Sequence, residues 1–191
     1  ELDDTLVVFT SDHGEMLGDH RLWRKTYAYE GSARVPLVVK FPDRIAAERG
    51  QVVDRPVGLE DLMPTFLDIA GVDIPETVEG RSLFPLVAEG GSEPDWREYY
   101  HGEHGQIYHV ENATQYLVDE RYKYVWNPIT GDELFFDLHS DPGEEEDLST
   151  DADHQHLVES FRQRLIERLA DRSESFSDGE TLRTVDPDVA W

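Results

Sequence analysis

Hydrophobic positions in the first 88 residues alternate with polar segments in a way that predicts strands and helices in turn. Residues 6–9 form an apolar run of leucine, two valines and phenylalanine, and polar residues follow at once. Such a run is typical of a strand buried in a parallel sheet. A second apolar run predicts another strand over residues 36–41. This part of the chain is therefore expected to be α/β.

A helix is predicted over residues 59–70, between this second strand and a turn-rich stretch. Leu62, Phe66 and Ile69 recur at near-helical spacing, so we expect their stripe to pack into the core. Pro64 lacks a backbone N–H and fits only a kink or the first turn. It therefore predicts either a kink or a helix that begins at Met63.

The pattern changes near residue 97 to short alternating segments that are typical of β-hairpins. Residues 115–118 and 122–126 flank a short polar turn and predict a hairpin, and residues 133–138 predict a further strand. Together these segments predict a small antiparallel sheet.

An amphipathic helix is predicted beyond the acidic turn at residues 141–147. Its apolar residues recur four apart, and we expect this face to cover the antiparallel sheet. They are Leu157, Phe161, Leu165 and Leu169. Residues 173–191 are polar and acidic, and we expect them to cross the surface or fray. Residues 89–95 are rich in turn formers and predict a linker.

Candidate chemistry lies directly after the first predicted strand, in the sequence Asp12, His13, Gly14. Ligands of open α/β sheets bind at the carboxyl ends of strands. A carboxylate oxygen and an imidazole nitrogen can share one divalent ion, and Gly14 removes a side chain that would crowd it. The alternative is a strand-end turn with two solvated polar side chains.

A longer match favours the metal site over the turn. The chain resembles the second half of the sulfatase family, in the alkaline phosphatase superfamily, and is most similar to its arylsulfatase and choline-sulfatase-like branch. The resemblance extends over roughly residues 5–170, with its motifs in the same order. The matching segments are residues 10–20, 22–25, 29–39, 59–68, 80–83 and 134–144.

The resemblance implies a fold and a division into domains. Residues 1–88 are expected to be the C-terminal part of an alkaline-phosphatase-like catalytic α/β domain with a partial sheet. Residues 97–172 would form a small α+β subdomain with an antiparallel sheet and a C-terminal helix. Residues 173–191 would be the polar tail.

The resemblance also implies roles for individual residues. Asp12 and His13 match two ligands of a single divalent cation, for which Ca²⁺ is expected first and Mg²⁺ or Mn²⁺ next. Many family members have asparagine where His13 stands, and the imidazole keeps Mn²⁺ or Zn²⁺ open. Lys25 matches the lysine that contacts the sulfate oxygens, which gives it a catalytic and substrate-binding role. Its alternative is an exposed lysine that balances nearby acids.

Three further residues are considered for a role in or near the site. His104 lies in a His-Gly-Glu-His stretch and is predicted to reach over the sulfate pocket, against the alternative of a polar residue at a strand end. His20 could support the ligands of the site or be simply an exposed polar residue of the loop, and we favour the latter. Arg34 precedes the second strand and is expected to tie the loop to a carboxylate.

The nucleophile half of a sulfatase site is missing from these residues. The family uses formylglycine made from cysteine or serine in a Cys/Ser-x-Pro-x-Arg motif, and the chain has no cysteine. In the nearest look-alike, which begins at Ser92, the arginine falls one position late at Arg97, so we interpret it as an interdomain turn. The resemblance implies that the other two metal-binding aspartates belong to the family's N-terminal region, and nothing before Leu6 can provide them. The chain is therefore expected to be the C-terminal part of a longer enzyme and inactive alone.

The resemblance leaves alternatives open. A phosphate or phosphonate monoester hydrolase uses the same metal cradle, because both anions are tetrahedral. A non-catalytic remnant or binding module would keep these residues without the nucleophile. The expected partner is a small-molecule sulfate ester, whereas its organic group, the oligomeric state and the localisation stay open.

The excess of acidic residues restricts which partners and which salt conditions suit this chain. Asp and Glu number 42 against 17 Lys and Arg, which gives a formal net charge of -25. Such a surface repels nucleic acid and anionic membranes, and it repels itself unless salt screens it. We therefore expect no nucleic-acid or membrane partner and suspect a halophilic source.

Overall fold

The chain forms two compact units. The computed structural model describes residues 1–88, 93–107 and 109–187. The first unit comprises residues 1–12 and 35–100, and the second comprises residues 13–34 and 101–191. The predicted linker at residues 89–95 lies partly outside the described residues. The second unit thus includes residues 13–34, a segment that the predicted division assigned to residues 1–88.

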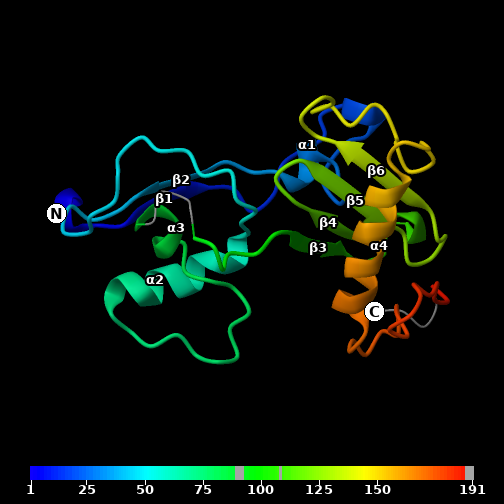
Figure 1. Cartoon of the computed structure of the whole chain (residues 1–191). Coiled ribbons are helices and arrows are strands. Elements are labelled where there is room, and N and C mark those ends of the chain that lie inside the picture. The colour runs from blue at the N-terminus through cyan, green and yellow to red at the C-terminus, as the bar shows by residue number, and fades with distance from the viewer. Residues whose placement is uncertain (89–92, 108, 188–191) are drawn as a thin grey trace. The chain divides into compact units, whose positions relative to one another are not determined.

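Among the described residues, the first unit contains a sheet of strands β1 and β2 and the α-helices α2 and α3 (Figure 1). Strand β1 (Val7–Thr10) pairs antiparallel with β2 (Leu37–Lys40), with Phe9 opposite Val38. Both predicted strands are confirmed, but the expected parallel pairing is wrong among the described residues. An apolar run specifies a strand without specifying the direction of its neighbour.

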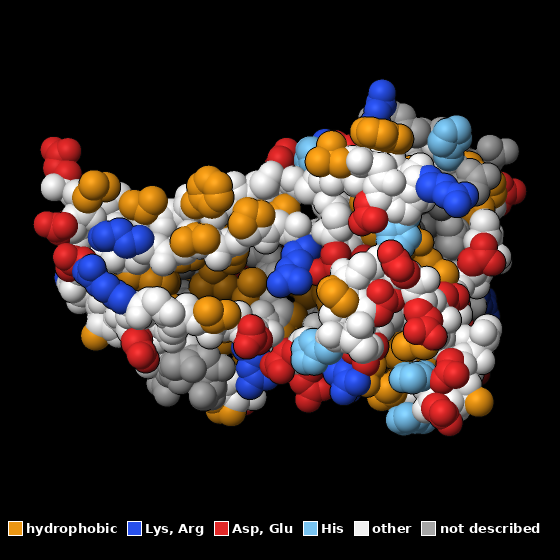
Figure 2. All heavy atoms as spheres, turned by 90° about the horizontal axis from the view of Figure 1, so that it is seen from above, with side chains coloured by type: hydrophobic (Ala, Val, Ile, Leu, Met, Phe, Trp, Pro, Cys, Tyr) orange, Lys and Arg blue, Asp and Glu red, His pale blue; other side chains and the backbone are white. Residues whose placement is uncertain are grey.

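The expected burial of β1 is also wrong in this structure. Phe9 is 66% exposed and its partner Val38 is 61% exposed. Figure 2 shows hydrophobic side chains gathered on this face of the first unit. Inward and outward residues alternate along β1, so the sheet has one covered and one uncovered face.

Helix α2 (Leu62–Ala70) follows a 3-10 turn at Leu59–Asp61, and Gly71 ends it with a left-handed backbone. Pro64 lies in the first turn of α2, where its missing N–H costs no helical hydrogen bond. Leu62 packs against a core of Leu83, Leu86 and Trp96, of which Leu86 belongs to helix α3 (Phe84–Ala88). The predicted apolar stripe is wrong for Phe66, however, because that ring is exposed.

Asp61 is a fully buried carboxylate that joins three parts of the first unit. Its Oδ1 accepts from Arg81 N at 2.8 Å and from Arg97 Nη2 at 2.6 Å. Its Oδ2 accepts from Gly58 N at 2.9 Å and from Arg97 Nη1 at 2.8 Å. Four donors therefore converge on one charge, which offsets the cost of burying it. Arg97, expected in an interdomain turn, is thus half of a bidentate ion pair.

The second unit is built on a four-stranded sheet in the order β3-β4-β5-β6. The pairing of β4 (Thr114–Val118) with β5 (Tyr122–Trp126) confirms the predicted hairpin, and β6 (Glu133–Asp137) confirms the third predicted strand. Strand β3 (Tyr100–His104) adds an edge, and its first residue groups with the first unit. The antiparallel sheet is confirmed.

Both faces of this sheet are covered. Helix α4 (Gln155–Leu169) packs on one face, as predicted, and the Phe161 ring meets Phe135 edge-on at 5.5 Å between centroids. On the other face, Val125 and Phe136 form a buried cluster with Ala28 of the segment 13–34. Alternate residues of β5 therefore face two different partners, which explains why most of this strand is buried.

The tail is better packed than its polar composition predicts. Phe176 is fully buried and meets the Trp126 ring edge-on at 6.1 Å. Ser177 Oγ donates to Ile166 O at 2.8 Å, which attaches the tail to α4. One aromatic residue thus anchors the described part of this segment. Among the described residues, the structure has no helix of the length and apolarity that a membrane span requires.

Candidate active site

Residues 13–34 form the segment that carries most of the predicted site, and a close backbone contact fixes its start. Gly14 N donates to Ser32 O at 2.8 Å. A Cβ atom on Gly14 would lie 2.1 Å from Gly31 O, which no side chain can do without moving the backbone. Gly14 is therefore required for this approach, and the expected role of making room for an ion is not needed to explain it.

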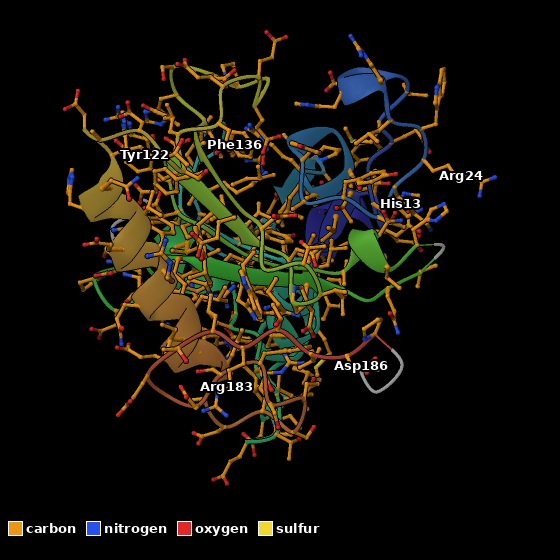
Figure 3. The ribbon with its side chains drawn as sticks, turned by 90° about the vertical axis from the view of Figure 1, so that its right-hand side faces the viewer. His13, Arg24, Tyr122, Phe136, Arg183 and Asp186 are labelled. Carbon is orange, nitrogen blue, oxygen red and sulfur yellow. The ribbon has the colours of Figure 1, made fainter. Side chains whose placement is uncertain are left out.

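The same segment folds back on itself so that its two arms lie side by side. Met16 N donates to Arg24 O at 2.9 Å, and Gly18 N donates to Leu22 O at 2.8 Å. Met16 is buried beneath this turn. Figure 3 shows His13 and Arg24 on the same side of the second unit. The structure therefore brings the neighbourhoods of His13 and Lys25 together in one loop.

The backbone around Lys25 lies in a sparsely populated conformation. Arg24 and Thr26, its two neighbours, have φ angles of 73° and 96°. Left-handed backbone is rare for residues other than glycine and is an outlier for a β-branched residue such as Thr26. Leu17, His20 and Arg21 also have positive φ angles. Strain of this kind persists only where surrounding contacts impose it, and it clusters at functional sites.

Lys25 itself is exposed. Among the residues that the structure describes, no hydrogen bond or ion pair involves its ammonium group. A solvated ammonium on a constrained backbone remains available for an anion.

His13 has a ring orientation that suits a metal ligand. Its Nδ1 lies 2.7 Å from Gly14 O, and a carbonyl oxygen only accepts, so Nδ1 carries the hydrogen. The lone pair of the neutral ring then lies on Nε2, which is the arrangement found in metal-binding histidines. Asp12 is exposed, and its Cα lies about 3.8 Å from that of His13 because the two are consecutive. This donor set fits a divalent cation.

His104 occupies the end of β3, as expected for a strand end. Its Nδ1 donates to Gly105 O at 2.5 Å. No hydrogen bond joins His104 to His13 or Lys25 in the described part of the chain. His101 of the same strand is half-buried, and its Nε2 lies 2.8 Å from Gln115 Oε1. Burial lowers the pKa of His101, which favours its neutral form.

His20 and Arg34 have structural contacts. The His20 ring stacks on Tyr29 with 4.0 Å between centroids, and its Nε2 lies 2.8 Å from Gly143 O. The expectation of a merely exposed loop residue is therefore wrong for His20. Arg34 pairs with Glu30 at 3.3 Å on the exposed surface, as expected for a structural arginine.

A buried ion cluster beneath this segment was not foreseen. Lys123 of β5 is 1% exposed, and its Nζ donates to Glu30 Oε1 at 2.6 Å and Glu144 Oε1 at 2.8 Å. Burial raises the pKa of Glu144, and the nearby Lys123 ammonium opposes that rise. The strand pattern did not mark it, because alternation places Lys123 on the opposite face of β5 from Tyr122, Tyr124 and Trp126.

Solved structures define the class of protein to which this arrangement belongs. BT4656, solved in complex with its substrate D-glucosamine-2-N,6-O-disulfate, has a TM-score of 0.75 and 30% identity, over 88% of this chain and 35% of that one. The phosphonate monoester hydrolase of Agrobacterium radiobacter has a TM-score of 0.73 and 32% identity, over the same shares of the two chains. The fold is that of the alkaline-phosphatase-like sulfatases.

Sequence comparison gives the family. Residues 18–171 match the family described as N-sulphoglucosamine sulphohydrolase, C-terminal. An arylsulfatase of Clostridium perfringens is 40% identical over 183 residues, which cover 95% of this chain and 37% of the relative. The chain belongs to the sulfatase family and corresponds to its C-terminal region. It spans little more than a third of the length of this relative.

Proposed function

We propose that this chain is the C-terminal part of a metal-dependent sulfatase that hydrolyses sulfate esters. The observation that carries the proposal is the constrained loop on which Lys25 stands, between two residues with positive φ angles. Holding a residue in such a conformation costs about 1–3 kcal/mol of folding stability, and strain of this size clusters at functional sites. The matched sulfatases support the same conclusion.

Lys25 would bind the sulfate group directly. As the ester bond breaks, negative charge develops on the sulfate oxygens, and a fixed ammonium nearby stabilises it. The loop contributes by fixing where that ammonium starts, because its flanking residues have little backbone freedom.

Asp12 and His13 would hold the divalent cation, with Ca²⁺ expected ahead of Mg²⁺ or Mn²⁺. When bound, such a cation neutralises charge on the sulfate oxygens as a Lewis acid. Gly14 O accepts from Nδ1 of His13, so that Nε2 would be the nitrogen that coordinates the cation. The described residues contain no cluster of three or more potential ligands, so further ligands would come from other residues. The formylglycine nucleophile would likewise come from other residues of the longer enzyme.

The test uses the longer enzyme and an aryl sulfate. Lys25→Ala should lower kcat/KM by about 10²-fold or more, because it removes a charge that contacts the developing anion. Arg21→Ala is the matched control, since it removes an exposed cation from the same loop, also at a positive φ angle. Equal activity of Lys25→Ala and the control would reject the assignment.

Metal content tests the other half of the site. Asp12→Asn should reduce the metal retained after dialysis, and turnover should fall with it. Removal with a chelator followed by return of Ca²⁺, Mg²⁺ or Mn²⁺ separately identifies the ion. Unchanged metal content and turnover in Asp12→Asn would remove Asp12 from the ligand set.

A phosphonate or phosphate monoester hydrolase is the second candidate. The similarity to the Agrobacterium radiobacter enzyme, at 32% identity, favours it specifically. Comparison of kcat/KM for matched aryl sulfate, phosphate and phosphonate esters decides between them. A preference for the phosphonate by more than about tenfold would favour this second candidate.

The predicted role of His104 in selecting the organic group is proposed on its place at the end of β3. His104→Ala should alter the ranking of sulfate esters more than it alters the rate with a minimal aryl sulfate. An unchanged ranking would leave His104 with its bond to Gly105 as its only role.

The acidic composition supports a saline environment. With a net charge of -25, repulsion within the molecule should weaken as salt rises. The unfolding midpoint should therefore increase between about 0.1 M and 2 M KCl, where the Debye length falls from ~10 Å to under ~3 Å. A midpoint independent of KCl would contradict a halophilic source.

A further inference from the structure

Lys123 is an ammonium group with all three hydrogens engaged inside the second unit. Its Nζ donates to Ala28 O at 2.8 Å as well as to Glu30 and Glu144. Three donors and three acceptors leave no capacity for water. Two of these acceptors belong to the segment that carries Lys25.

Glu144 completes the cluster from the acidic turn that follows β6. Its Oε1 accepts from Lys123, and its Oε2 accepts from Glu30 N at 2.6 Å. Glu144 has a φ angle of 56°, so its backbone also lies in the left-handed region. A glutamate in this conformation is uncommon, which indicates that the contacts hold it there.

These contacts hold the loop of Lys25 at both ends. On the N-terminal side, His20 bonds to Gly143 O, next to Glu144. On the C-terminal side, Ala28 O and Glu30 bond to Lys123, and Glu30 N bonds to Glu144. The loop between them includes the two neighbours of Lys25 that have positive φ angles. One corner of the second unit therefore restrains the loop before and after Lys25.

Stability alone does not account for this cluster. A buried ion pair is often no more stabilising than apolar residues of the same volume, because desolvation offsets the attraction. The face of β5 that carries Lys123 also contributes Val125 to an apolar cluster, so an apolar residue could have been accommodated. The hydrogen bonds of Lys123 are directional, so they fix the positions of their partners, whereas an apolar contact does not.

We propose that Lys123 and Glu144 are positioning residues that hold the Lys25 loop in its sulfate-binding conformation. This inference rests on the proposed function of Lys25. Lys123 and Glu144 would act through the loop and would not touch the substrate. Their loss should therefore weaken sulfate binding only while Lys25 is present.

A double-mutant cycle in the longer enzyme tests this dependence. The readouts are KM for an aryl sulfate and the inhibition constant of inorganic sulfate. Lys123→Met should raise both about tenfold, because a displaced ammonium binds the anion poorly. In the Lys25→Ala background, Lys123→Met should have less than about a twofold further effect, since residues that act as a unit are not additive.

Arg162→Met supplies the matched control. Arg162 forms a bidentate pair with Glu133, at 2.7 and 2.6 Å, and connects α4 to β6 away from the segment 13–34. Its loss should lower stability while KM and the inhibition constant stay unchanged. A merely structural role for Lys123 would give the same result as this control.

Glu144→Gln keeps the test decisive if Lys123→Met does not fold. The amide retains the size of Glu144 but places an NH₂ group against either Lys123 or Glu30 N, so one bond is lost. It should produce the same pattern with a smaller rise in both constants. Hydrogen exchange of residues 17–30 should quicken in Glu144→Gln and not in Arg162→Met.

The outcomes separate the two proposals. If Lys25→Ala has no effect on KM, turnover or sulfate inhibition, the proposed function of Lys25 fails. If Lys25→Ala is impaired, but Lys123→Met and Glu144→Gln raise KM and the inhibition constant as much in the Lys25→Ala background as in the parent, only the positioning role is refuted. Unchanged exchange in residues 17–30 would refute it as well.

Discussion

Asp61→Asn in the first unit should be among the most destabilising conservative changes in this chain. The carboxylate accepts four hydrogen bonds on two oxygens, two of them from the Arg97 guanidinium. An asparagine replaces one oxygen with NH₂, which would face two of those donors whichever way the amide turns. Arg97, only 13% exposed, would lose its buried countercharge and keep only Glu60, whose carboxylate is 3.7 Å away and 44% exposed.

The magnitude follows from these contacts. Breaking one partner of a buried pair costs about 3–5 kcal/mol, and each charge-assisted bond accounts for ~1.5–3 kcal/mol of it. At 1.4 kcal/mol for each factor of ten, amide protection in this unit should fall by about two to three orders of magnitude. The affected helix is α2, whose first turn begins beside Asp61.

Hydrogen exchange of peptides from residues 58–84 is the suitable assay, because peptides of the second unit serve as an internal reference. Asp68→Asn is the control, since Asp68 is exposed and accepts a single described bond, from Ser82 Oγ at 2.5 Å. It should change protection by less than about tenfold. Equal losses in Asp61→Asn and Asp68→Asn would refute the importance of the buried carboxylate.

Three further predictions concern backbone contact and pH. Gly14→Ala should destabilise the segment 13–34 by more than about 2 kcal/mol, because its Cβ would meet Gly31 O, and quicker exchange of that segment would show it. The Arg121 guanidinium holds the pKa of Asp137 well below its usual range, so the stability that this pair contributes is complete above pH ~4 and is lost as pH falls through the lowered pKa. Acid unfolding of Arg121→Gln should therefore begin at higher pH than that of the parent. An unchanged acid-unfolding profile would contradict this. Burial, followed by the charges of Glu60 and Asp61, raises the pKa of Tyr100 to about 12. The stability that the neutral phenol contributes should therefore be complete below pH ~10 and decline as pH rises toward 12. A Tyr100→Phe variant should lack this decline.

Much of the second unit could be predicted from its sequence because its signals are local. The hairpin and α4 follow from alternation and from apolar residues four apart, and both appear at the expected positions. The direction of β1 could not be predicted, since an apolar run indicates a strand and carries no information on its neighbour. The exposure of Phe66 could not be predicted either, because helical spacing does not state what lies opposite.

The candidate site was predictable only where a short motif carries it. Asp12, His13 and Lys25 follow from the family's motif, and their roles stay predictions. The Lys123 cluster joins residues far apart in the chain, because Glu30 lies 93 positions before Lys123 and Glu144 lies 21 positions after it. No local pattern encodes such a meeting. Phe176 shows the same limit, since one buried ring anchors a tail whose composition is polar.

The interleaving of the two units has a consequence for protein engineering. The segment 13–34 belongs with residues from 101 onward, although 66 residues of the first unit, 35–100, separate them in the chain. A chimaera that exchanges only the C-terminal half between two sulfatases would therefore combine Glu30 from one parent with Lys123 and Glu144 from the other. Recombination should succeed more often when both pieces are inherited together, so crossover points belong at residues 12, 34 and 100.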